Sequence, residues 1–177
     1  IYAFGDISGA HFNPAVTWAF YLARVLPARD LAPYICAQII GALLAALLLK
    51  LSYPESDAGM TRTSVGVPAG FLTEVLLSFM LMLVILHVSQ GARERGLMAG
   101  VAIGGCVGLD ALVGGPLTGA SMNPARSIGP ALAAGDVSLL WLYIVAPLLG
   151  TSGAVWTCRW LLEEECCRWW VQYRAIK

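Results

Sequence analysis

The chain has 177 residues, of which 58% are hydrophobic and 12% are charged, and its mean hydropathy is +0.73. Such values exclude an ordinary soluble domain and predict a protein embedded in a lipid bilayer. Eleven basic and eleven acidic residues cancel, so the composition predicts no nucleic-acid partner. Two His and five unevenly spaced Cys form neither a ligand cluster nor a nucleophile with its base, so we expect no metal, no cofactor and no enzymatic activity.

The first helix signal in the chain is short. Asn13 is a favoured N-cap residue and Pro14 a favoured first helical residue, so a helix is predicted over residues 13–23. About 11 residues span roughly 16 Å, about half of a bilayer core of about 30 Å. The segment therefore enters the membrane without crossing it.

Four later segments are apolar over about 20 residues each, the length that crosses a bilayer. They are residues 31–51, 67–89, 97–117 and 139–158. In the third of these, Gly100, Gly104 and Gly108 follow one another at intervals of four, which predicts close approach of another helix. Positive residues lie mainly on one side of the predicted spans, which assigns the loop around residues 90–96 and the C-terminus to the cytoplasm.

The short segment at residues 13–23 has a second copy. Residues 8–17 read SGAHFNPAVT and residues 118–127 read TGASMNPARS, so Asn123 and Pro124 predict a second short helix over residues 123–133. Three spans separate the copies, and an odd number requires them to enter from opposite faces. We therefore expect one channel domain, with the end of one inverted repeat at 1–66, a second repeat at 67–162 and a cytoplasmic tail at 163–177.

Two short helices that enter from opposite faces meet with their N-termini near the midplane, where their backbone must face protein or water. This arrangement predicts either a pore or a midplane binding site. A secondary transporter is the alternative, because transporters also use inverted repeats with broken helices. No Asp, Glu or Lys lies beside either short helix start, and this absence of an ion site favours the pore.

The paired motifs, with Arg126 directly after the second, resemble those of the major intrinsic protein family, which comprises the aquaporins and aquaglyceroporins. Further similar stretches are residues 34–38, 74–84, 115–130 and 141–150. The resemblance implies an all-α, aquaporin-like inverted-repeat bundle of six spans and two half-helices, assembled as a homotetramer in the plasma (inner) membrane. The family has two spans before the first motif, whereas only Ile1 to Phe4 stand in their place here, so we expect the first span and most of the second to be missing.

The same resemblance assigns the pore residues. The two motifs are Asn13, Pro14, Ala15 and Asn123, Pro124, Ala125. Three of the four positions that set the narrowest point map onto Ala111, Ala120 and Arg126. Alanine where strict water channels carry His implies a wider, more apolar filter, as in nodulin-like and bacterial members that pass glycerol and metalloid acids.

Other positions favour water instead. Glycerol facilitators carry Asp and a basic residue where this chain has Ser127 and Ala131. The sequence therefore predicts a passive channel for water and small uncharged solutes that excludes ions and protons, and the preferred solute stays open.

Three polar residues are expected to support the pore loops. Glu74 is implied to accept backbone N–H bonds from the loop of the second motif, and Gln38 to do the same for the first. His11 is expected to be packed and hydrogen-bonded near the cytoplasmic mouth, with a pH gate as the alternative. Asp110 is expected either to satisfy loop backbone at the outer interface or to tune solute entry. Acylation of Cys166 or Cys167 is a further possibility.

Overall fold

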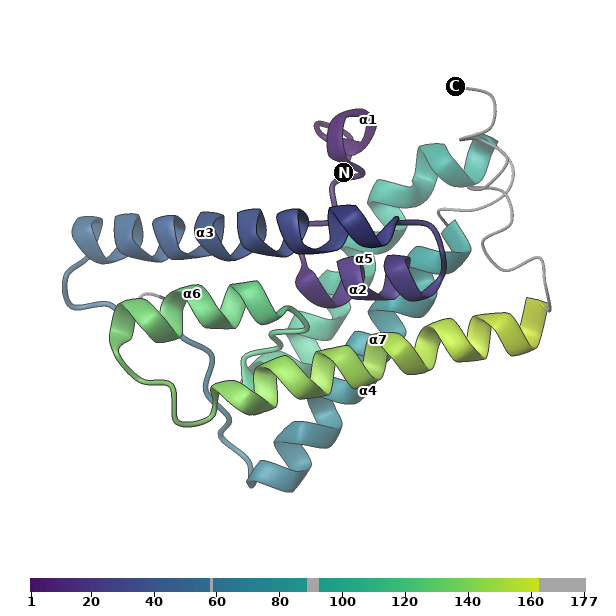
Figure 1. Cartoon of the computed structure of the whole chain (residues 1–177). Coiled ribbons are helices and arrows are strands. Elements are labelled where there is room, and N and C mark those ends of the chain that lie inside the picture. Colours follow the sequence, from purple (N-terminus) through teal and green to yellow (C-terminus); the bar gives the residue numbers. More distant parts are fainter. Residues whose placement is uncertain (58, 89–92, 163–177) are drawn as a thin grey trace.

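The computed structural model of the chain describes residues 1–57, 59–88 and 93–162, with the side chains of 93–97 excepted. Over these residues it contains seven α-helices and no strand (Figure 1). They are α1 (Gly5–Ser8), α2 (Pro14–Leu22), α3 (Ala28–Ser52), α4 (Val67–Val88), α5 (Arg93–Thr118), α6 (Pro124–Ala134) and α7 (Leu140–Leu162). Four of them, α3, α4, α5 and α7, are long and apolar enough to cross a membrane, as the sequence predicts.

The helix ends differ from the prediction mainly at N-termini. Helix α3 begins at Ala28, three residues early, because Pro27 occupies the N-cap position in an extended conformation. The one-turn helix α1 was not predicted, and it ends at Gly9 with φ of 73°, a left-handed conformation that glycine adopts readily. The predicted tail, with Cys166 and Cys167, lies outside the described residues.

Three pairs of helices pack closely along their lengths, α4 against α7, α3 against α6 and α4 against α5. The first two of these contacts each depend on a glycine. A Cβ placed on Gly150 of α7 would lie 2.3 Å from the carbonyl oxygen of Val75 in α4, and one on Gly129 of α6 would lie 2.5 Å from the backbone of Ala42 in α3. The helix backbones therefore touch where these side chains are absent, as is usual in membrane bundles.

The predicted glycine stripe on α5 makes no equivalent contact. A Cβ on Gly104 or Gly108 would meet no atom within 4 Å in the described chain, and one on Gly100 would meet the ring of Tyr2. Within the described residues, the close helix contacts lie at Gly129 and Gly150, and the approach of a helix to the α5 stripe stays a prediction.

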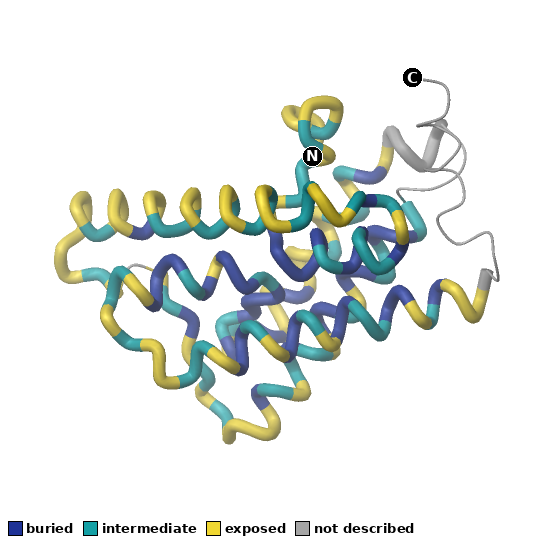
Figure 2. Tube along the Cα trace, in the orientation of Figure 1, coloured by how far each residue is buried: buried dark blue, intermediate teal, exposed yellow. Residues whose placement is uncertain are grey.

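The buried core surrounds the two short helices. Buried side chains come from α2, α4, α7 and the loop before α6, among them Val16, Phe20, Met82, Met122 and Val155. Figure 2 shows the buried trace concentrated in this centre, whereas α3 is largely exposed. Figure 1 shows α2 and α6 arranged end to end beneath α3. The N-termini of the two short helices consequently meet in the best-packed part of the molecule.

Candidate functional site

Each short helix begins with an asparagine cap. The Oδ1 atom of Asn13 accepts hydrogen bonds from the backbone N–H groups of Ala15 and Val16, at 2.9 and 3.5 Å, and Pro14 is the first residue of α2. A helix N-terminus leaves several N–H groups without partners inside the helix, and the asparagine oxygen satisfies two of them.

The second cap repeats the first almost atom for atom. The Oδ1 atom of Asn123 accepts from the N–H groups of Ala125 and Arg126, at 3.0 and 3.4 Å. The backbone of Asn123, with φ −149° and ψ 108°, nearly matches that of Asn13, with φ −149° and ψ 117°. The two motifs therefore fold alike although 110 residues separate them in the sequence.

The two caps also hold each other. The Nδ2 atom of Asn13 donates to the carbonyl oxygen of Met122 at 2.8 Å, and Nδ2 of Asn123 donates to that of Phe12 at 3.0 Å. Met122 directly precedes Asn123, and Phe12 directly precedes Asn13. The exchange is reciprocal, as expected of related repeats, and it fixes the positive ends of two helix dipoles beside each other.

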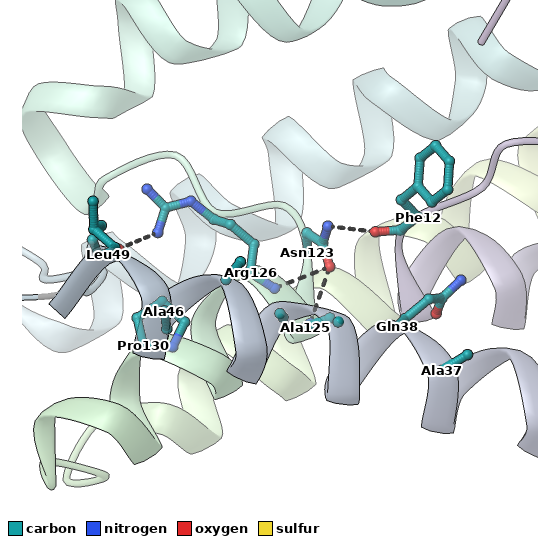
Figure 3. Close-up of a pocket in the computed structure, with 13 residues that line it drawn as sticks. Phe12, Ala37, Gln38, Ala46, Leu49, Asn123, Ala125, Arg126 and Pro130 are labelled. Carbon is teal, nitrogen blue, oxygen red and sulfur yellow. Dashed lines mark hydrogen bonds between the residues drawn. The ribbon is translucent and has the colours of Figure 1, made fainter. Parts of the chain in front are cut away.

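A cavity of about 560 Å³ opens beside the second cap (Figure 3). Asn123, Ala125 and Arg126 lie on one side, and Gln38 and neighbouring residues of α3 lie on the other. Its further lining residues are Phe12, Ala37, Gly41, Ala42, Ala45, Ala46, Leu49, Gly59 and Pro130.

Two predicted filter residues lie elsewhere. Within the part of the chain that the structure describes, the lining of this cavity does not include Ala111 or Ala120. Ala111 is exposed on α5, and Ala120 is buried in the second loop with a φ of 42°. This cavity therefore brings together Arg126 and Asn123, and the filter of Ala111, Ala120 and Arg126 stays a prediction.

Arg126 has a partner that the sequence did not suggest. Its Nη1 atom donates to the carbonyl oxygen of Gly59 at 2.9 Å, across the connection between α3 and α4. Gly59 has a φ of 77° and lies inside a turn in which the N–H of Met60 donates to the carbonyl of Asp57. Asp and Gly two residues apart in a loop favour such a turn, but they do not indicate a bond to the arginine.

Glu74 lies in the middle of α4 with no exposed surface. Its Oε1 atom accepts from the Thr118 hydroxyl at 2.7 Å and from the N–H of Ser121 at 2.8 Å, and Oε2 accepts from the N–H of Met122 at 2.8 Å. Tyr143 adds a bond from its hydroxyl to the carbonyl of Thr118, at 2.8 Å. One carboxylate thus collects the donors of the loop that precedes the second cap.

Gln38 and His11 meet at the first loop. The Nε2 atom of Gln38 donates to the carbonyl of His11 and to the Thr17 hydroxyl. The His11 ring lies 2.8 Å from the same hydroxyl and stacks on Tyr34, with ring centroids 4.5 Å apart. A second cavity of about 450 Å³ lies against these side chains.

Asp110 has a side-chain partner on its own helix. It is buried on α5, and its carboxylate accepts from the Cys106 thiol at 3.5 Å, one turn earlier on the same helix. Its described hydrogen bonds include none to loop backbone, and a role in solute entry stays a prediction.

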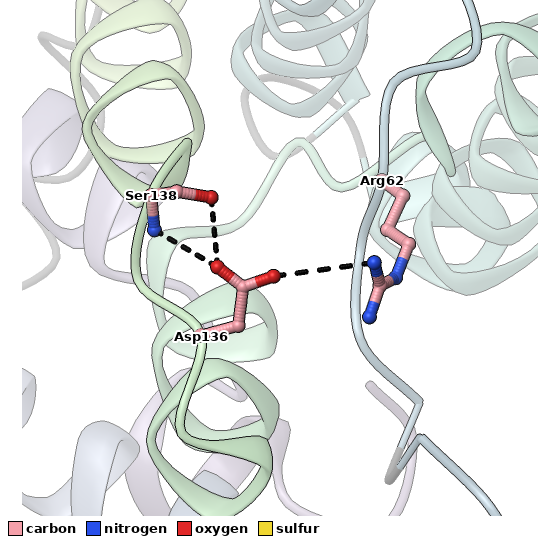
Figure 4. Close-up of polar contacts among 3 residues, drawn as sticks. All are labelled: Arg62, Asp136 and Ser138. Carbon is pink, nitrogen blue, oxygen red and sulfur yellow. Dashed lines mark hydrogen bonds and ion pairs between the residues drawn. The ribbon is translucent and has the colours of Figure 1, made fainter.

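An ion pair joins the α3–α4 connection to the turn between α6 and α7 (Figure 4). Arg62 Nη1 lies 3.9 Å from Asp136 Oδ2, while Asp136 Oδ1 accepts from the hydroxyl and the N–H of Ser138. These hydrogen bonds, with a smaller contribution from the Arg62 charge, lower the pKa of Asp136 below its ordinary value. The carboxylate is therefore kept charged at the surface between these two loops.

The fold and the paired caps match one known family. A family model described as "Major intrinsic protein" matches residues 1–157. The chain belongs to the major intrinsic protein family. The aquaporin NIP1-1 of Zea mays is 43% identical over 159 residues, which cover 88% of this chain and 56% of that protein. Nodulin-26 of Glycine max is 42% identical over 161 residues, which cover 88% and 58%.

The chain spans about half the length of these curated relatives of the major intrinsic protein family. Among solved structures, the aquaglyceroporin of Plasmodium falciparum superposes with a TM-score of 0.74, at 23% identity, over 90% of this chain and 75% of that one. The shared architecture makes this chain an all-α, aquaporin-like helical bundle, and its four long apolar helices are those of an integral membrane protein.

Proposed function

We propose that this chain forms part of a passive membrane channel that conducts water and small uncharged solutes and excludes ions and protons. The observation that carries the proposal is the reciprocal pair of hydrogen bonds between the two asparagine caps, from Asn13 to Met122 and from Asn123 to Phe12. These bonds join two helix N-termini inside a membrane bundle. Such a junction repels cations and leaves neutral molecules unaffected.

The size of this repulsion follows from the helix dipole. Each N-terminus carries about +0.5 charge, which at roughly 6 Å and an effective dielectric constant of about 20 opposes a cation by about 1.4 kcal/mol. Two such ends reduce the cation population about 100-fold. The positive charge of Arg126, which lies on the same cavity as Asn123, adds to the exclusion.

The asparagine amides supply the attraction for neutral solutes. Each NH₂ group has two donors, and the bond to the opposite loop uses one of them. The second donor of each amide is available to an oxygen atom that passes between the caps. Water and hydroxylated solutes offer such oxygens, and a fixed pair of donors orients each molecule as it passes.

The solute class is proposed from the filter positions. By the family resemblance, Ala111 and Ala120 belong to the narrowest point together with Arg126, and their small side chains favour solutes wider than water, such as glycerol or metalloid acids. One of the reported relatives is named as an aquaporin, and the structural neighbour is named as an aquaglyceroporin. We place Pro14, Ala15, Pro124 and Ala125 in the pore motifs, and Glu74, Gln38 and His11 in support of them.

We further propose a homotetramer in the plasma (inner) membrane, with residues 1–66 and 67–162 as parts of two inverted repeats and the C-terminus in the cytoplasm. The excess of Arg on one side of the spans supports this orientation. Protease protection of a C-terminal tag in sealed inside-out and right-side-out vesicles tests it.

The decisive experiment is osmotic water flux in proteoliposomes that contain the full-length protein. We expect faster osmotic shrinkage than in empty liposomes, with solute fluxes that are linear in the gradient and independent of proton or sodium gradients. Shrinkage at the rate of empty liposomes would exclude a water channel. Saturable uptake driven by an ion gradient would instead favour the secondary transporter.

A further inference from the structure

The α3–α4 connection contacts the second loop at a point that none of the sequence patterns indicated. Thr61 is 5% exposed, and its hydroxyl donates to the hydroxyl of Ser127 at 2.8 Å. Its side chain also lies over Gly119, where a Cβ would come within 3.4 Å of Thr61 Cγ2. A threonine in a connecting loop is thus buried between the loop before α6 and the first turn of α6.

The hydroxyl of Thr61 begins a chain of three buried hydroxyls. Ser127 and Ser121 have their Oγ atoms 2.5 Å apart, and Ser121 donates to the carbonyl of Asn123 at 3.0 Å. A hydroxyl has one proton to donate. Because Ser121 gives its proton to Asn123, Ser127 must donate to Ser121, and Thr61 must donate to Ser127. All bonds in the chain therefore run in one direction, from the connection to the second cap.

The same part of the α3–α4 connection contacts both the side chain of Arg126 and the helix residue that follows it. Gly59 accepts from the guanidinium of Arg126 at 2.9 Å, while Thr61, two residues later, bonds to Ser127, the next residue along α6. The α3–α4 connection therefore binds the guanidinium of Arg126 and also the first turn of α6, which carries this residue. The Arg62–Asp136 pair (Figure 4) holds the next residue of the connection. The N–H of Ser64 donates to the carbonyl of Leu117 at 2.9 Å and holds a later part of it.

We propose that Thr61 is a positioning residue for Arg126. Its hydroxyl bond to Ser127 fixes the position of the Gly59 carbonyl, which accepts from the guanidinium. In this way Thr61 sets the width of the channel beside Arg126. This inference rests on the proposed channel function. Loss of the Thr61 hydroxyl leaves Ser127 without its donor and frees the connection beside Gly59. The guanidinium of Arg126 then moves more, and the permeability for a larger solute rises more than the permeability for water.

The test compares Thr61→Val, which removes the hydroxyl at nearly constant shape, with Thr61→Ser, which keeps it. The measured quantity is the ratio of glycerol to water permeability in proteoliposomes of the full-length protein. We expect Thr61→Val to raise this ratio about fivefold, the factor that corresponds to one net hydrogen bond, and Thr61→Ser to restore it. Thr73→Val is the matched control, because Thr73 is partly exposed on α4 and its hydroxyl bonds within its own helix.

Two further arms separate positioning from a general loss of structure. With Arg126→Ala in the background, Thr61→Val should leave the ratio unchanged, because no guanidinium remains to be positioned. An equal fall in both permeabilities, or the same fivefold rise in that background, overturns the proposal. Ser127→Ala removes the other end of the bond and should reproduce the effect if Thr61→Val does not fold.

A readout that does not require transport keeps the two proposals apart. Phenylglyoxal modifies exposed guanidinium groups, and peptide mass spectrometry measures its reaction rate at Arg126. We expect Thr61→Val to raise that rate about fivefold and Thr73→Val to leave it unchanged. If the wild-type protein passes no water, the proposed function fails, yet a faster phenylglyoxal reaction at Arg126 in Thr61→Val still supports the positioning role of Thr61. An unchanged phenylglyoxal reaction rate at Arg126 overturns the positioning role of Thr61, whatever the fluxes show.

Discussion

A buried carboxylate such as that of Glu74 is tolerated only where donors surround it, because an unpaired charge in a bundle interior is very unfavourable. Here three donors converge on its two oxygens, from Thr118, Ser121 and Met122. Ionised Glu accepts at both oxygens and donates at neither. The carboxylate is therefore satisfied by donors from the loop before α6, and the conformation of that loop depends on these bonds.

Replacement of Glu74 by Gln should destabilise the protein by about 1.5–3 kcal/mol. One oxygen becomes an NH₂ group, which faces a backbone N–H and leaves that donor unsatisfied. The midpoint of thermal unfolding in detergent measures the effect, with Thr73→Val on the same helix as the control. A midpoint equal to that of the wild type would mean that the loop does not rely on this carboxylate.

At the scale of residues, the asparagine caps were predictable from local sequence, and the family resemblance implied that Glu74 accepts from the second loop, but nothing indicated the partner of Arg126. Capping is local, since the oxygen of Asn13 or Asn123 reaches N–H groups two and three residues ahead, so a tripeptide suffices to predict it. The Gly59 carbonyl that holds Arg126 lies 67 residues away in the chain. No local pattern encodes a backbone carbonyl as a partner.

At the scale of helices, packing depends on where backbones touch. Gly129 lies against the backbone of Ala42, and Gly150 lies against that of Val75. In a membrane, helices associate through such close packing because lipid offers little hydrophobic gain between them. The periodic stripe on α5 was more regular in sequence, yet Gly104 meets no side chain or backbone of the described residues within 4 Å.

We expect Gly129→Ala to lower stability by about 1–3 kcal/mol, because the added methyl group must push α6 away from α3. Gly104→Ala makes the same chemical change in a helix with open space and should be neutral or stabilising by up to about 1 kcal/mol. Unfolding midpoints of the two variants in the same detergent provide the comparison. Equal effects would show that helix propensity, not the α3–α6 contact, governs position 129.

At the scale of the whole molecule, the two asparagine amides join the loop before α2 to the loop before α6. The bond from Asn13 spans 109 residues of sequence and that from Asn123 spans 111. Neither loop could keep its position if the other moved, because each amide donates to the backbone beside the other. We therefore expect the two bonds to be coupled, so that loss of one amide weakens the bond made by the other.

A double-mutant cycle of Asn13→Ala and Asn123→Ala measures this cooperativity. Each single variant should lose about 0.5–2 kcal/mol from its cap, and the pair should deviate from additivity by about 0.5–3 kcal/mol. Asn13→Ala combined with Ser138→Ala, in the turn between α6 and α7, should be additive. Strict additivity in the first cycle would indicate two independent caps.

The sequence by itself determined the membrane environment, the four long helices and the two short capped helices, because composition, hydrophobic length and capping act over a few residues. Counting the spans between Asn13 and Asn123 further predicts that the two short helices enter from opposite faces. The tertiary structure decided which donors meet Glu74, which carbonyl holds Arg126, where Thr61 is buried and which glycines let helices touch. Those contacts join backbone atoms and small side chains from distant segments, and such groups carry almost no distinguishing signal in a sequence until the fold brings them together.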